Sequence, residues 1–179
     1  MTKVLYLESQ KRALEYYEKA NVILTQDEKE NIEVADFGLN DLESVGLEIV
    51  TYVNTSRCCA KELVLFPFQT CPEHIHPPIE GEPGKEETFR CRYGKVYLYV
   101  EGDKPETIKA RVPKTGGEFY TAFHEIILEA GMQYTLYPNT KHWFQAAGQG
   151  AVVSEFSTKS RDEADIFTNP NIGRIPVIE

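Results

Sequence analysis

The residues best suited to chemistry are two histidines and a glutamate near the middle of the chain. His74 and His76 stand two positions apart in the segment Cys-Pro-Glu-His-Ile-His-Pro-Pro, and Glu87 follows eleven residues after His76. On an extended chain, residues two apart point to the same face, so both imidazoles can face one partner. Imidazole nitrogens and carboxylate oxygens are ligands of divalent transition metals. The segment therefore predicts part of a metal site.

The spacing of these residues resembles the first motif of the cupin family, an H-x-H pair followed by a glutamate and then a glycine. Gly94 follows Glu87 with six residues between them, and this count favours Glu87 over Glu86 as the ligand. The gap between His76 and Glu87 is longer than the common form of the motif. Prolines and glycines fill it, as expected of an inserted loop.

A fourth ligand is expected from a later strand. His142 lies eleven residues after Gly131, which matches the overall length of the second cupin motif. The interior of this motif departs from the common pattern, because Pro138 is displaced by one position and Asn139 and Ala146 replace a glycine and an asparagine. The resemblance implies a metal site made of four residues: His74, His76, Glu87 and His142.

Three imidazoles and one carboxylate leave open positions on an octahedral divalent ion. Such a donor set suits Mn²⁺, Fe²⁺, Co²⁺, Ni²⁺ or Zn²⁺, and the pattern does not choose among them. An ion with open positions can act as a Lewis acid on the oxygens of a substrate. The remaining histidine, His124, is expected at a strand end without a role in the site. The four cysteines form no C-x-x-C pair, so we expect reduced thiols.

The elements that position these residues are predicted to be strands. From Leu47 onward, apolar residues alternate with others in short runs, and glycines and prolines separate the runs. Many short strands with frequent turns predict a mainly β fold, and the motifs make it a cupin (jelly-roll) β-barrel. Tyr93-Gly94-Lys95 is interpreted as a tight hairpin. The expected strands are Glu62–Phe68, Glu86–Arg92, Lys95–Glu101, His124–Glu129, Gln133–Tyr137, Lys141–Ala146 and Ala151–Ser157.

The N-terminal part of the chain predicts helices packed outside this barrel. Ser9 could cap a helix whose apolar residues recur at helical spacing, and Thr25 could cap a second one. We expect one cupin domain over residues 1–179. It would comprise a helical extension over 1–45, the barrel over 46–160, and a C-terminal tail over 161–179 that wraps over the barrel surface.

Composition excludes several classes of partner. The formal net charge is −9 with scattered basic residues, which argues against nucleic-acid binding. No apolar run approaches the roughly 20 residues that span a bilayer, so no membrane association is expected. The first residues, Met-Thr-Lys-Val-Leu-Tyr, lack the long apolar stretch of a signal peptide, which predicts a cytoplasmic protein.

Longer segments resemble the D-lyxose isomerase family over nearly the whole chain. The resemblance implies a metal-dependent aldose–ketose isomerase that interconverts D-lyxose and D-xylulose, and also D-mannose and D-fructose. It further implies a preference for Mn²⁺ and a homodimer. The segments that carry it are Asn31-Ile-Glu-Val-Ala-Asp-Phe-Gly, Cys59-Ala-Lys-Glu-Leu-Val-Leu-Phe-Pro, Gly84-Lys-Glu-Glu-Thr-Phe-Arg-Cys-Arg-Tyr-Gly, Pro138-Asn-Thr-Lys-His-Trp-Phe-Gln-Ala and Val153-Ser-Glu-Phe-Ser-Thr.

Such a reaction moves a hydrogen between two adjacent carbons and needs a base and an oxyanion partner. Glu155 lies in an otherwise apolar strand, so it is either paired on the outer face or placed in the cavity as the base, and the cavity is favoured. Lys85 is two residues before Glu87, which puts it on the same face as a candidate oxyanion partner. Asp162 and Arg161 could close the mouth of the barrel, but a charged surface run is the favoured interpretation.

Three other functions remain open at this point. A cupin oxygenase would use Fe²⁺ and O₂, so turnover without O₂ separates it from an isomerase. A non-catalytic sugar-binding cupin would bind sugar and metal without turnover, but the complete ligand set and the absence of a DNA-binding segment argue against it. A phosphosugar isomerase would need a cluster of cations or a glycine-rich anion site, and no such cluster stands out.

Overall fold

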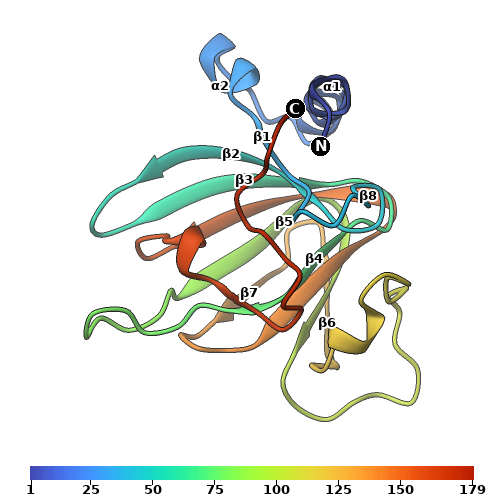
Figure 1. Ribbon diagram of the computed structural model, residues 1–179, viewed down its shortest axis with the longest axis vertical. Coiled ribbons are helices and arrows are strands. Elements are labelled where there is room, and N and C mark those ends of the chain that lie inside the picture. The colour runs from blue at the N-terminus through green and yellow to red at the C-terminus, as the bar shows by residue number, and fades with distance from the viewer.

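The computed structural model describes residues 1–179, and a strongly curled nine-stranded sheet forms its body (Figure 1). The two long strands β5 (Glu87–Val100) and β8 (His142–Ser157) pair with each other and connect the two sides of the barrel. The remaining strands are β1 (Glu33–Ala35), β2 (Leu47–Asn54), β3 (Cys59–Leu65), β4 (Thr70–Ile75), β6 (His124–Glu129), β7 (Gln133–Leu136) and β9 (Ile166–Phe167).

The strand β8 has different neighbours along its two halves. Its first half pairs with β4 and its second half with β3, while β5 lies along its other edge. The start of β5 pairs with β7 and its end pairs with β6. Because β5 and β8 are antiparallel, their starts lie at opposite ends of the pair, and the curl of the sheet brings the first side chains of both strands together in the interior.

The predicted hairpin at Tyr93-Gly94-Lys95 is wrong. Gly94 instead lies within the continuous strand β5, with a φ of 77°, and the pairing register with β8 shifts on either side of it. A β-bulge and a hairpin both use a glycine with positive φ, so the sequence pattern alone does not separate them. The two expected strands on each side of Gly148 are likewise one strand, β8, whereas His124–Glu129 is confirmed as β6.

The interior of the barrel is filled from alternating positions of the strands. Leu47 and Ile49 on β2 and Leu63 and Leu65 on β3 point into the main core, as period-two alternation requires. Trp143 lies in a separate cluster, away from this core. It stacks on Tyr99 and donates its indole N–H to the carbonyl of Ala122. A separate apolar layer on the outer face lies under the first helix.

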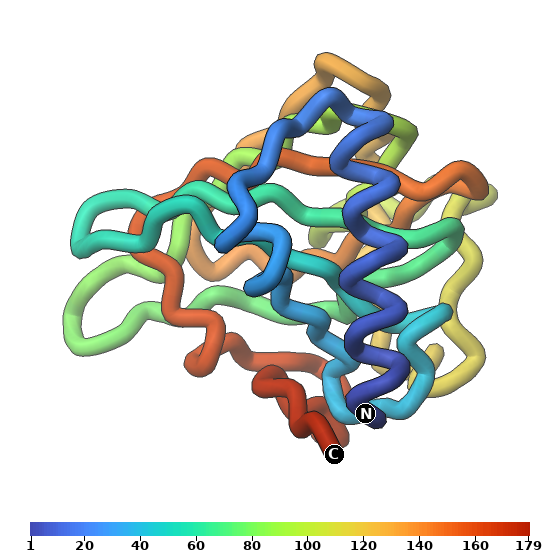
Figure 2. The backbone as a smooth tube through the Cα atoms, turned by 90° about the horizontal axis from the view of Figure 1, so that it is seen from above, coloured from blue at the N-terminus to red at the C-terminus, as the bar shows by residue number.

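Helix α1 (Lys3–Lys19) covers that outer face (Figure 2). Ala13, Tyr16 and Tyr17 pack on apolar side chains of β2, β3 and β8. The helix begins after Thr2, whose hydroxyl accepts the N–H of Leu5, so the predicted cap at Ser9 is wrong. No helix in the structure is long and apolar enough to cross a membrane.

Helix α2 (Gln26–Glu30) begins at its expected cap. The hydroxyl of Thr25 accepts the N–H of Glu28, and the Glu28 carboxylate accepts the N–H of Thr25, which forms a capping box. The N-terminal region also contributes the strand β1, which pairs with β2. It is therefore not purely helical.

The C-terminal tail also joins the sheet. Strand β9 pairs with β4, and the chain then returns to α1, so the two termini lie side by side (Figures 1 and 2). The amino group of Met1 donates to the carbonyl of Val177 at 2.7 Å. The tail crosses the barrel opening on this path and brings polar side chains to it.

The bulge at Gly94 allows a stability test with a matched control. A Cβ at Gly94 would lie 2.0 Å from the carbonyl oxygen of Gly150, whereas a Cβ at Gly131 would meet nothing within 4 Å. Both glycines have positive φ, so alanine at either position is expected to cost about 1–2 kcal/mol of backbone strain. Gly94→Ala is expected to cost about 1–3 kcal/mol more, because β5 and β8 must separate. Urea unfolding of both variants measures the difference, and equal losses would contradict this packing.

Candidate metal centre

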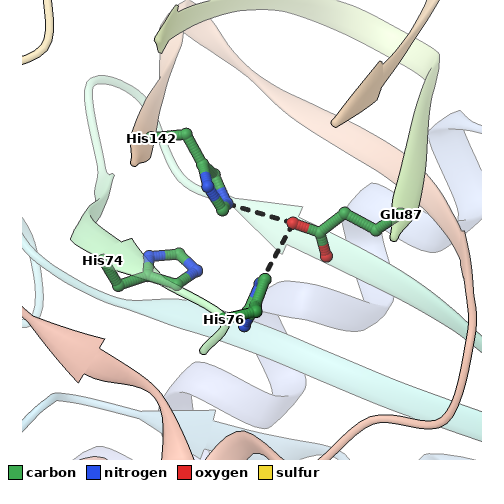
Figure 3. A group of neighbouring side chains, drawn as sticks. All are labelled: His74, His76, Glu87 and His142. Atoms are coloured by element: carbon green, nitrogen blue, oxygen red, sulfur yellow. Dashed lines mark hydrogen bonds and ion pairs between the residues drawn. The ribbon is translucent and has the colours of Figure 1, made fainter. Parts of the chain in front are cut away.

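Three strands bring the four predicted ligands together inside the barrel (Figure 3). His74 lies on β4 and His76 directly after it, while Glu87 begins β5 and His142 begins β8. His74 and His142 are register partners across the β4–β8 pair. All four side chains are buried, and their ligand atoms lie within 4.8 Å of one another. This is the arrangement expected of a site that could hold a metal ion.

The histidine rings of β4 and β8 are oriented by backbone carbonyls. Nδ1 of His74 lies 2.8 Å from the carbonyl oxygen of Pro72, and Nδ1 of His142 lies 2.9 Å from that of Thr140. A carbonyl only accepts hydrogen bonds, so each Nδ1 carries a proton, and the tautomer that this selects presents the lone pair of Nε2. These lone pairs face the centre of the cluster.

Hydrogen-bond acceptor atoms face one another in the cluster, and a cation placed between them would be attracted to all of them. Nε2 of His142 is buried without a hydrogen-bond donor, and it lies 3.0 Å from Oε1 of Glu87. A buried acceptor without a partner is costly. Ligands on opposite sides of one ion would lie about 4.2 Å apart, given metal–nitrogen bonds of about 2.1 Å. The donors therefore fit one divalent ion, which would neutralise Glu87 and occupy the lone pairs.

The pKa values of the cluster follow from burial and from the neighbouring charges. Burial, together with the nearby His142 and His76, lowers the pKa of His74 well below its usual value. Burial also lowers the pKa of His76, but the Glu87 carboxylate outweighs burial and raises it to about 9. A metal ion must then displace a proton from His76, so ion binding is expected to strengthen as the pH rises toward 9.

The two candidate catalytic residues lie in the same cavity as the cluster. Nζ of Lys85 lies 2.8 Å from Oε2 of Glu87 and 3.1 Å from Oε1 of Glu155. Glu155 is 4% exposed and also accepts a hydrogen bond from Ser157. Burial lowers the pKa of Lys85, but the Glu155 and Glu87 carboxylates outweigh burial and raise it well above the usual value. Lys85 is therefore a buried cation that bridges two carboxylates.

Further charged residues, of which the sequence pointed only to Asp162, continue this arrangement toward the tail. Nζ of Lys61 lies 2.7 Å from Oδ2 of Asp162 and 4.0 Å from Oε1 of Glu155. Arg174 lies 3.1 Å from the same Asp162 oxygen and 2.5 Å from Glu33. The result is a chain of alternating charges that runs through Glu87, Lys85, Glu155, Lys61, Asp162, Arg174 and Glu33.

The interpretation of Asp162 as part of a charged surface run is wrong. Its carboxylate lines the cavity, and although burial raises its pKa, Lys61 and Lys85 outweigh burial and lower it. The sequence did contain a signal for Lys61. It lies two and four residues before Leu63 and Leu65, so all three side chains share the inward face of β3. No comparable periodicity marks the tail residues, because the tail is mostly irregular.

Other residues weighed from the sequence lie outside the cluster. Glu86 is exposed, and His124 is exposed at the start of β6. Phe89 lines the cavity and is the register partner of Glu155 across β5 and β8. All four cysteines are free thiols, as expected. Apolar side chains cover the rest of the cavity wall, among them Leu47, Ile49, Leu63, Phe89, Phe144 and Phe167.

Solved structures with a similar fold confirm the predicted cupin barrel. The L-ribose isomerase of Cellulomonas parahominis, solved with L-ribose, superposes with a TM-score of 0.81 at 17% identity, over 100% of this chain and 98% of that one. The L-ribose isomerase of Acinetobacter sp. DL28, in complex with L-ribose, gives 0.80 at 15% identity with the same coverage. At this identity the similarity establishes the fold alone, which is that of the cupin-type sugar isomerases.

Sequence relatives identify the family. The D-lyxose isomerase family model matches residues 15–179. A D-lyxose/D-mannose isomerase of Thermosediminibacter oceani is 64% identical over 96% of this chain and 95% of its own length. A D-lyxose ketol-isomerase of Cohnella laeviribosi is 59% identical over 96% and 94%. The chain belongs to the D-lyxose isomerase family, as the resemblance predicted, and is a sugar isomerase.

The adjacent glutamates Glu86 and Glu87 test the metal centre directly. Glu87→Gln should weaken Mn²⁺ binding about 10-fold or more, because the variant loses the only ligand charge in the cluster. Glu86→Gln is the matched control and should bind Mn²⁺ as the unmodified protein does, since its side chain is exposed. Isothermal titration of the metal-stripped proteins measures both affinities. Weak binding by the Glu86 variant with normal binding by the Glu87 variant would reverse the assignment.

Proposed function

We propose that this chain interconverts D-lyxose and D-xylulose, and also D-mannose and D-fructose, with a divalent metal ion at the buried cluster. The names of its relatives in Thermosediminibacter oceani and Cohnella laeviribosi support these sugars. The observation that carries the proposal is the position of Glu155 and Lys85 beside the four-residue cluster in one cavity. A base, a cation and a metal centre are the groups that an aldose–ketose isomerisation requires.

In this proposal His74, His76, Glu87 and His142 hold the ion. When bound, the ion supplies a Lewis acid for the oxygens on the two reacting carbons of the sugar. The donors are nitrogens and oxygens without a thiolate, which is compatible with Mn²⁺. The choice of Mn²⁺ over Fe²⁺, Co²⁺, Ni²⁺ or Zn²⁺ rests on the family resemblance.

Glu155 is the proposed base. Its carboxylate would take a proton from one carbon of the substrate and return it to the neighbouring carbon. It is buried, and Lys85 and Lys61 flank it, so its position in the cavity is fixed by ion pairs. Fixed placement of this kind lowers the entropic cost of reaching the reactive geometry.

Lys85 is the proposed oxyanion partner. An ammonium group has three N–H donors. One N–H of Lys85 bonds to Glu155, and the ammonium also forms an ion pair with Glu87. A further N–H remains for the substrate oxygen on which negative charge develops during proton transfer. Because the metal ion would share this charge, Lys85 is expected to matter less than Glu155.

The homodimer also remains part of the proposal. A row of side chains on the outer face of the sheet runs through Val53, Ala60 and Phe156, which are register partners across β2, β3 and β8. Val53 and Phe156 are exposed. An exposed apolar row of this kind is compatible with self-association.

The base assignment is tested by Glu155→Gln, which keeps the shape of the side chain but removes its basicity. The variant should lose a factor of about 10² to 10⁴ in kcat on D-lyxose and still bind Mn²⁺. Glu62→Gln is the matched control: Glu62 is a buried carboxylate one strand away that bonds to Ser154 on the outer face, and its variant should keep normal turnover. Ketose formation from D-lyxose measures the rates.

A second arm of the same experiment follows the hydrogen in D₂O. Proton transfer through Glu155 predicts that deuterium enters the product at the carbon that receives hydrogen. Complete retention of the substrate's own hydrogen would instead indicate a hydride shift, which needs no base. Near-normal turnover by the Glu155 variant would remove this residue from the reaction directly.

A further inference from the structure

One of the three histidines is held by a residue far away in the sequence. His74 and His142 each bond through Nδ1 to the carbonyl of the residue two positions before them. Nδ1 of His76 instead lies 2.5 Å from Oδ1 of Asp165, a residue 89 positions later in the C-terminal tail. The orientation of His76 therefore depends on tertiary structure, whereas the other two rings are set locally.

The local chain around His76 offers no substitute for this contact. His76 lies just beyond the end of β4, where the chain turns into the Pro77-Pro78 segment. The ring is buried, and the only other partner recorded for its nitrogens is Glu87, at Nε2. Without Asp165 the remaining partner, the Glu87 carboxylate, would favour the tautomer with the proton on Nε2, which removes the lone pair needed for a metal ion.

The tail holds Asp165 in place at several points. Ile166 and Phe167 form the strand β9, and Phe167 is the register partner of His74. The backbone N–H of Thr168 donates to the carbonyl of Glu73 at 3.1 Å, and its hydroxyl donates to the Glu73 carboxylate at 2.7 Å. These bonds hold the tail against β4, which carries His74 and leads into His76. The Asp165 carboxylate therefore has a fixed position relative to the His76 ring.

We propose that Asp165 is a positioning residue that sets the tautomer and orientation of His76 and thereby the affinity for the metal ion. Its carboxylate accepts the proton of Nδ1, which leaves the Nε2 lone pair directed at the cluster. A carboxylate behind a ligating imidazole also increases the basicity of the ligand, and loss of such a partner typically costs about 10- to 100-fold in metal affinity. The inference rests on the proposed metal site and adds that the C-terminal tail completes it.

The test compares Mn²⁺ affinity, measured by isothermal titration, among metal-stripped variants. Asp165→Asn keeps the size of the side chain but loses its charge, and its amide can also donate to Nδ1 and favour the wrong tautomer. It should bind Mn²⁺ about 10-fold more weakly, and Asp165→Ala up to about 100-fold more weakly. Glu163→Gln is the matched control, because Glu163 is an exposed carboxylate in the same segment and should leave the affinity unchanged.

Measurements of kcat at saturating Mn²⁺ and of the unfolding temperature distinguish two roles for Asp165: positioning of His76, and anchoring of the C-terminal tail alone. If Asp165 acts through the metal ion, saturating Mn²⁺ should restore most of the lost kcat of Asp165→Asn. If Asp165 only anchors the tail, its variants should unfold at lower temperature without metal while keeping normal Mn²⁺ affinity, and the proposal is overturned. Should Asp165→Ala fail to fold, Asp165→Asn decides, and normal affinity in that variant also overturns the proposal.

The outcomes distinguish this inference from the proposed function. Absence of Mn²⁺ binding by the unmodified protein would contradict the metal site itself. Tight binding by the unmodified protein together with equally tight binding by both Asp165 variants would contradict only the role of Asp165. Weaker binding by the Asp165 variants with normal binding by the Glu163 control supports the inference.

Discussion

The site depends on one physical constraint, the convergence of acceptor atoms in a buried space. The Nδ1 atoms of His74 and His142 bond to carbonyls, so Nε2 of each ring is left for the cluster, where that of His142 lies 3.0 Å from the Glu87 carboxylate. Burial removes the water that would otherwise satisfy these atoms. A cation at the centre would relieve this conflict. The starts of β5 and β8 and the end of β4 supply the four side chains that could hold it.

The alternating positive and negative side chains reduce the free-energy cost of burying charge in the rest of the cavity. Isolated buried charges are costly, but here each lysine or arginine lies between two carboxylates. Lys85 lies between Glu87 and Glu155, and Lys61 lies between Glu155 and Asp162. These ion pairs link the His–Glu cluster, through Glu87 on β5, to the tail, so the charge of one group supports the ionisation of the next. Apolar side chains such as Phe89 and Phe144 line the same cavity.

The sequence predicted the parts of this structure that depend on local pattern. Histidines are rare in the chain, and the resemblance of the spacing of His74, His76 and His142 to the cupin motifs predicted that they meet. Thr25 was found as a helix cap because the capping box is local. The hairpin at Gly94 was wrong because positive φ serves both bulges and turns. Asp165 and Arg174 could not be found, since only tertiary folding of the irregular tail brings them to the site.

Anomalous X-ray diffraction from crystals grown with Mn²⁺ tests the central claim most directly. Data collected on either side of the manganese absorption edge locate the ion without reference to activity. We expect a single strong peak about 2 Å from Nε2 of His74, His76 and His142 and from a carboxylate oxygen of Glu87. A cavity without a peak, or a peak held by other residues, would contradict it.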